Sequence, residues 1–168
     1  MNADALAIIA LGSNVGDSQS ILLRAMERLD GLSSRPARRS SLWQTPPVNC
    51  PPGSPMFLNA VVAMIPRAAE TPESLLGKLL QMEKDFGRKS THILNEPRRL
   101  DLDLIAFGDE TRATKELTVP HPRAHERRFV LQPLSEIAPD LVLPGQRKTV
   151  AQLLAGINPG EKLVRLNF

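Results

Sequence analysis

The order of apolar and amphipathic segments is the feature that most constrains the fold of this chain. Four runs have the length and apolar content of β-strands: residues 5–11, 40–45, 57–65 and 98–107. Two segments with apolar residues at helical spacing lie between them, one beginning at Asp17 or Ser18 and one capped by Thr71. This order predicts an α+β fold of the ferredoxin-like βαββαβ type, with an antiparallel sheet and helices on one face.

The C-terminal part of the chain adds helical segments to this core. "RRFVLQPLSEIA" has an apolar stripe interrupted by Pro133, and "VAQLLAGI" is a second short helical stretch. They predict a C-terminal helical appendix. At 168 residues, with no internal repeat beyond the approximate βαβ duplication and no linker, residues 1–168 are expected to form one domain.

Composition excludes several classes of protein. No apolar run approaches the roughly 20 residues that span a bilayer, and the N-terminus lacks the basic region of a signal peptide. A lone Cys50 cannot form an internal disulfide, which favours a reducing compartment. We therefore expect a cytoplasmic protein that does not bind membranes.

The charge and the aromatic residues indicate small-molecule partners. The net charge is +3, and the chain has no Tyr, one Trp and five Phe, so a stacking surface for nucleic acid would be poorly furnished. The chain has no heptad pattern, and we expect a monomer. Its partners should be small anionic molecules and not nucleic acid.

Two aspartates stand within the last apolar strand, "PRRLDLDLIAF". Alternation places Asp101 and Asp103 on one face, with Cα atoms about 7 Å apart, and the flanking leucines on the other face. At about 6 Å the two carboxylates repel by roughly 3 kcal/mol at an effective dielectric near 20. A cleft would therefore require a cation such as Mg²⁺ between them. A solvated outer face, with Arg98 or Arg99 as partners, is the alternative that this motif leaves open.

Arginines surround this strand, at positions 88, 98, 99, 123, 127 and 128. Guanidinium groups bind phosphate oxygens in a bidentate manner, so basic loops beside an acidic strand favour a site for polyphosphate and metal. The turn "GSNVGD" lacks the Lys-Ser/Thr of a Walker A loop and the glycine pattern of a Rossmann turn. A common nucleotide-binding loop is therefore absent from the sequence.

Six segments together resemble one family: "LGSNVGD", "LWQTPPV", "FLNAVV", "EKDFGR", "PRRLDLDLIAFGDE" and "LTVPHPRAHERRFVLQPLSEIAPDLVLP". The family is 6-hydroxymethyl-7,8-dihydropterin pyrophosphokinase, of folate biosynthesis. The resemblance implies transfer of pyrophosphate from ATP to the hydroxymethyl group of the pterin, with release of AMP. It also implies two Mg²⁺ ions, held by Asp101 and Asp103 and by the triphosphate of ATP, the co-substrate.

The resemblance also assigns roles to individual residues. The residues implied in catalysis are Arg88, Arg98, Asp101 and Asp103. Those implied in the pterin pocket are Thr45, Pro47, Val48, Phe57, Asn59 and Phe129. Those implied in ATP binding are Leu76, Glu83, Arg88, Arg98, Thr118, His121 and Arg127. Asn59 would read the edge of the pterin while Phe57 and Phe129 sandwich its ring, although the residues alone favour an ordinary core position for both phenylalanines.

The chain departs from the family pattern at several positions: Pro122 stands where an aromatic residue often follows the His, Glu116 where a basic residue often lies, and one loop differs more. Leu94, Asn95 and Glu96 stand where many members have a basic residue, a Trp and a Gly, so we expect ATP affinity and loop closure to differ. A degenerate member that binds pterin or nucleotide without catalysis is one alternative, and an RNA-binding ferredoxin-like module is another. The identity of the general base stays open between an aspartate and a metal-bound hydroxymethyl group.

Overall fold

The computed structural model describes residues 5–45, 53, 56–87, 99–158 and 163–166, and the structural statements below concern these residues. The strands are β1 (Ala7–Ser13), β2 (Arg38–Arg39), β3 (Trp43–Thr45), β4 (Phe57–Met64), β5 (Asp101–Phe107), β6 (Arg112–Ala113), β7 (Thr118–Val119) and β8 (Val164–Arg165). The helices are α1 (Ser18–Leu32), α2 (Pro72–Asp85), α3 (Arg128–Ile137) and α4 (Val150–Ala155), with a 3-10 turn, η1, at Ala124–Glu126.

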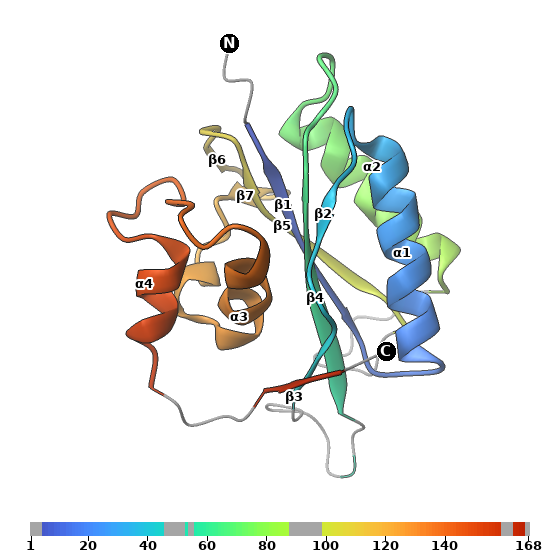
Figure 1. Cartoon of the computed structure of the whole chain (residues 1–168). Helices are drawn as coiled ribbons and strands as arrows, with labels where there is room; N and C mark the ends of the chain where they lie inside the picture. The colour runs from blue at the N-terminus through green and yellow to red at the C-terminus, as the bar shows by residue number, and fades with distance from the viewer. Residues whose placement is uncertain (1–4, 46–52, 54–55, 88–98, 159–162, 167–168) are drawn as a thin grey trace.

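The main sheet is antiparallel, as predicted. Its strand order is β5-β1-β4-β3-β8, with β2 paired to β4 beside β3, and β5 forms one edge. β6 and β7 form a separate two-stranded ribbon. The long strands β1 and β4 therefore lie at the centre of the molecule (Figure 1).

The strand predicted at residues 40–45 was wrong in detail, because two short strands, β2 and β3, occupy this region. Between them, Ser40 bonds Val61 twice: its N–H donates to the Val61 carbonyl at 3.0 Å, and its hydroxyl accepts the Val61 N–H at 2.8 Å. The side chain thus takes the place of a backbone carbonyl in the ladder. Regular pairing is interrupted there although the chain remains attached to β4.

The two helices predicted between the strands are present and begin where their caps indicate. Asp17 accepts the Ser20 N–H at the start of α1, and Thr71 forms a capping box with Ser74 at the start of α2. Both helices cover one face of the sheet (Figure 1). Their buried stripes pack with the alternate residues of β1, β4 and β5 that point to that side.

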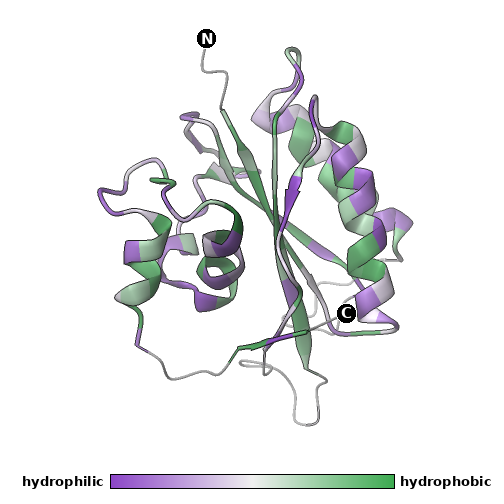
Figure 2. Ribbon diagram, in the orientation of Figure 1, coloured by the Kyte–Doolittle hydropathy of each residue, from purple (hydrophilic) through white to green (hydrophobic). Residues whose placement is uncertain are grey.

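The C-terminal helices form a second layer on the opposite face of the sheet (Figure 1). The prediction of helices on one face therefore holds for α1 and α2, whereas α3 and α4 cover the other face. α3 packs through Val130, Leu131 and Leu134 against a second cluster that includes Ile8 and Val61. β1 and β4 are consequently buried from both sides, which explains their continuous apolar sequences and their green ribbons in Figure 2.

Among the described helices, none combines the length and apolar character that crossing a membrane requires.

Candidate active site

One row of residues runs across the sheet and joins the two halves of the predicted site. Asp101 of β5 pairs with Gly12 of β1, Gly12 pairs with Asn59 of β4, and Asn59 pairs with Trp43 of β3. Residues paired directly across antiparallel strands share a face. The face is the one toward α3, since it also carries Ile8 and Val61 of the second cluster.

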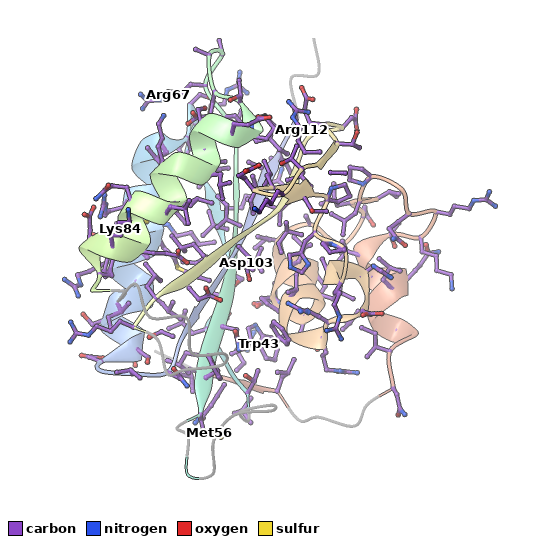
Figure 3. The ribbon with its side chains drawn as sticks, turned by 180° about the vertical axis from the view of Figure 1, so that it is seen from behind. Trp43, Met56, Arg67, Lys84, Asp103 and Arg112 are labelled. Atoms are coloured by element: carbon purple, nitrogen blue, oxygen red, sulfur yellow. The ribbon has the colours of Figure 1, made fainter. Side chains whose placement is uncertain are left out.

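Asp103 lies on the same face, one row further along β5, opposite Ala10 (Figure 3). Leu102 and Leu104 point to the other face and are buried in the cluster with α1 and α2, as the alternation predicted. Both aspartates are partly exposed. The strand thus presents two carboxylates on the α3 face and an apolar surface on the other.

Gly12 leaves space between these carboxylates and Asn59. A methyl group added there would lie 3.3 Å from the Asn59 Oδ1, which is closer than ordinary van der Waals contact. Ala10 in the next row is also small, so the side chains of β1 project little from the sheet between β5 and β4 at these two rows. Sequence reasoning missed Gly12. The available signal was a glycine inside an apolar strand, which often marks a close approach.

The pterin residues predicted on β3 and β4 lie together. Asn59 is 8% exposed, and its Nδ2 donates to the Thr45 hydroxyl at 2.8 Å. Phe57 pairs directly with Thr45 and is only partly buried. Pro47 and Val48 lie outside the described residues. A buried amide held on one side by a hydroxyl is oriented to form hydrogen bonds with a ligand.

Phe129 comes from α3, which packs over the same face of the sheet. Its ring is half-buried against the second cluster, and the Cζ of Arg127 lies 5.5 Å from the ring centroid. A guanidinium at this distance is attracted to the aromatic face. A residue predicted for the pterin and one predicted for ATP therefore stack on each other.

The residues predicted for ATP surround the edge strand β5 and do not lie on one surface. Leu76 and Glu83 belong to α2, in the other layer. Glu83 is 2% exposed, and its Oε2 accepts the Leu102 N–H at 2.8 Å. This carboxylate therefore bonds the backbone of β5 midway between Asp101 and Asp103.

His121 and Thr118, also predicted for ATP, belong to the segment that runs along β5 beyond its C-terminal end. The register of β5 shifts at Ile105, and the Ile105 carbonyl accepts the His121 N–H at 2.8 Å. Burial and the nearby Arg127 and Arg123 lower the pKa of His121 from its ordinary value of 6.5. Thr118 is exposed on β7, which contacts β5. Arg88 and Arg98 lie outside the described residues.

A hollow of about 680 Å³ opens in the other layer, between the N-terminal end of α1 and the C-terminal end of α2. Asp17, Arg24, Arg28, Asp85 and Arg99 are among its lining residues. Arg28 and Asp85 form an ion pair at 2.9 Å across it. Among the predicted pterin and ATP residues that the structure describes, none lines this hollow. The described residues of the predicted site lie mainly on the α3 face, where paired strands set the side chains.

A family model for 7,8-dihydro-6-hydroxymethylpterin-pyrophosphokinase (HPPK) matches residues 8–139, a range that contains the row from Asp101 to Trp43 and the whole of α3. The chain belongs to this family. The HPPK resemblance inferred from six sequence segments is thus confirmed, and with it the class of enzyme, an ATP-dependent pyrophosphokinase.

Curated relatives agree with HPPK membership. A 2-amino-4-hydroxy-6-hydroxymethyldihydropteridine pyrophosphokinase of Synechocystis is 38% identical over 152 residues, covering 90% of this chain and 76% of the relative. The enzyme of the same name from Haemophilus influenzae is 35% identical over 162 residues, covering 96% and 98%. The match therefore extends over almost the whole length of a relative of similar size.

Solved structures share the HPPK fold. The wild-type HPPK-DHPS protein of Plasmodium falciparum superposes with a TM-score of 0.70 at 13% identity, over 90% of this chain. The chain spans 44% of the length of that protein. At this identity the likeness concerns the fold, including a mixed α/β architecture with an antiparallel sheet.

Proposed function

We propose that this HPPK chain transfers the pyrophosphoryl group of ATP to the hydroxymethyl group of 6-hydroxymethyl-7,8-dihydropterin on the α3 face of its sheet. The observation that carries the proposal is the register of Asp101, Gly12 and Asn59. Three directly paired residues put a carboxylate and a pterin-reading amide about 10 Å apart on one face. The glycine between them lets the Asn59 amide lie close to the backbone of β1.

The pterin would occupy the β4 side of this row. Asn59 is held by Thr45 and turns its remaining polar capacity to a ligand. Phe57 and Phe129 supply aromatic surface from the strand and from α3 for a flat ring. A site built to hydrogen-bond the heterocycle rejects rings that lack matching groups, because its polar atoms would then stay unpaired.

Asp101 and Asp103 fit a magnesium site completed by substrate. Hard cations take carboxylate oxygens, and Mg²⁺ commonly keeps one or two from protein with phosphate and water as the rest. Within the described residues, no group of three or more His, Cys, Asp or Glu side chains gathers around one point, which agrees with such a substrate-completed site. Bound there, Mg²⁺ would neutralise charge on the triphosphate. We propose two ions, as the resemblance implies.

ATP would lie along the edge of β5, between Asp103 and the ribbon of β6 and β7. His121 and Arg127 lie on this side. Their polar groups, with Arg88 and Arg98, would hold phosphate oxygens and position the chain of phosphates for transfer. Leu76, Glu83 and Thr118 stay predictions for ATP binding, and Glu83 could act there only through β5, since its carboxylate accepts the Leu102 N–H.

The fold type and the domain organisation are also part of the proposal. The strand order β5-β1-β4-β3, with α1 and α2 on one face, supports the ferredoxin-like assignment, to which α3 and α4 add the C-terminal appendix. We propose that residues 1–168 act as one monomeric domain in the cytoplasm, on small molecules and not on nucleic acid or membranes.

AMP release from Mg-ATP, measured with and without the dihydropterin, tests the proposal. We expect pterin-dependent AMP release that Asp101→Asn and Asp103→Asn each reduce by at least about a hundredfold, by analogy with loss of one group that stabilises transition-state charge. A wild type that binds pterin yet releases no AMP would instead favour the degenerate, non-catalytic member.

A further inference from the structure

The Glu136 carboxylate joins the end of α3 to the strand that borders the pterin residues. Its Oε1 accepts the Trp43 indole N–H at 2.5 Å and the Ser41 N–H at 3.3 Å, and its Oε2 accepts the Ser41 hydroxyl at 2.8 Å. At the next residue of α3, the Ile137 carbonyl accepts a hydrogen bond from the Arg38 side chain at 3.1 Å. A carboxylate that accepts from three donors makes a stronger joint than neutral hydrogen bonds would.

On the sheet side, this joint leads directly to Asn59. Trp43 pairs with Asn59 in register, and Thr45, two residues along the same strand, accepts the Asn59 amide. β3 has only three residues, so it is short even for a strand and depends on its neighbours for its position. Trp43, at one end of β3, therefore bonds Glu136, and Thr45, at the other end, bonds Asn59.

On the helix side, the joint leads to Phe129. Glu136 and Phe129 are seven residues apart on α3, which is about two turns or 10.5 Å, and residues at this spacing lie on one stripe of a helix. The N-terminus of α3 has no side-chain cap. Buried apolar residues hold α3 on the sheet, and Glu136 adds directional hydrogen bonds to the strands at the far end of the stripe that carries Phe129.

We propose that Glu136 is a positioning residue for the pterin, acting through Trp43 and α3. Its hydrogen bonds set the distance between the Phe129 ring above the sheet and the Asn59 amide within it. The inference rests on the proposed function, in which these two side chains contact the pterin from different layers. A ligand held between two layers is sensitive to displacements of well under 1 Å in either one.

Pterin affinity is expected to respond more strongly than ATP affinity. Trp43→Phe keeps an aromatic ring and removes the N–H donor, and Glu136→Ala removes the acceptor. Each should weaken the binding of the dihydropterin about tenfold, the usual effect of losing a hydrogen bond to a charged group. Affinity for Mg²⁺ with a non-hydrolysable ATP analogue should change less than pterin affinity, because Asp101 and Asp103 are on β5 and, of the residues proposed for ATP, Arg127 is the one that stacks on Phe129.

Calorimetric titration of the full chain with dihydropterin, in the presence of that analogue and Mg²⁺, measures the effect on the pterin. A separate titration with the analogue and Mg²⁺ measures the effect on the nucleotide. The double variant Trp43→Phe/Glu136→Ala should bind pterin no worse than Glu136→Ala alone, since that single change already removes the acceptor of the Trp43 N–H. Glu136→Gln retains an oxygen for the Trp43 N–H and should recover part of the affinity. Thermal unfolding of each variant monitors folding.

Glu70→Gln is the matched control. Glu70 also accepts from a serine hydroxyl, that of Ser74, and from Lys78 at 2.8 Å, but it precedes α2, in the other layer. Its loss should leave pterin affinity unchanged. Equal pterin affinity in wild type, Trp43→Phe and Glu136→Ala would overturn the positioning role alone. A wild type that binds no pterin would overturn the proposed function and, with it, this inference.

Discussion

At the scale of single residues, the face toward α3 depends on small side chains as much as on reactive ones. Alternation within "LDLDL" was sufficient to predict the common face of Asp101 and Asp103, because the period of a strand is local information. The space left by Gly12 was not predictable in this way. It depends on Asn59, which lies 47 residues later in the chain and reaches Gly12 only through strand pairing.

Gly12→Ala should therefore reduce pterin binding without unfolding the protein. The added methyl group would lie 3.3 Å from the Asn59 Oδ1, so the amide must move by a few tenths of an ångström. We expect roughly tenfold weaker binding of dihydropterin by calorimetry, and a loss in unfolding free energy of about 1 kcal/mol, the low end for an added methyl group. Gly31→Ala in α1, where a methyl group meets nothing within 4 Å, should leave pterin affinity unaltered. Equal affinity in Gly12→Ala and wild type would contradict the crowding argument.

The pKa of His121 offers a second test at this scale. Burial, then Arg127 and Arg123, lower this pKa below its ordinary value of 6.5. The unfolded chain therefore binds the proton more readily than the folded one. As pH falls below about 6.5, protonation favours the unfolded chain and the free energy of unfolding decreases. Arg127→Gln should raise the pKa of His121 and Arg123→Gln should raise it less, as followed by NMR titration of the imidazole protons. An unchanged pKa in Arg127→Gln would show that the guanidinium does not act on His121.

At the scale of elements, features set by neighbouring residues were predicted correctly, and features set by contacts between distant residues were not. The start of α2 follows from Thr71, Pro72 and Ser74, which are neighbours in sequence. The division between β2 and β3 follows from the contact of Ser40 with Val61, 21 residues away. The packing of α3 against the second face likewise depends on tertiary contacts, and its apolar stripe indicated a buried side but not which layer would bury it.

Glu83 shows how one element holds the edge of another. It accepts the N–H of Leu102 on the edge strand β5, and an N–H buried there without an acceptor would be costly. We expect Glu83→Leu to lower the unfolding free energy by about 1–3 kcal/mol in urea. Glu83→Gln, which keeps an oxygen acceptor, should lower it by less. If both variants are equally stable, the bond to Leu102 contributes little to holding β5.

At the scale of the whole molecule, one sheet carries two helical layers and both cores meet at β1 and β4. Ile9 and Val62 belong to the cluster under α1 and α2, whereas Ile8 and Val61 belong to the cluster under α3 and α4. Successive residues of the same strand thus serve different layers. Loss of either layer would expose the central strands on one side, so the two layers should fold together.

Equilibrium unfolding tests this coupling with two independent signals. Trp43 is the one tryptophan in the sequence, and its bond to Glu136 places it between the sheet and α3, so its fluorescence reports the second layer. Far-UV circular dichroism reports all helices, including α1 and α2. We expect coincident transitions in urea for the wild type.

Leu131→Ala in one layer and Leu22→Ala in the other each delete a fully buried side chain and should cost about 2–5 kcal/mol. Both signals should shift together in each variant. A fluorescence transition that precedes the dichroism transition in Leu131→Ala would mean that α3 and α4 detach from an intact sheet, and the layers would then be separate folding units.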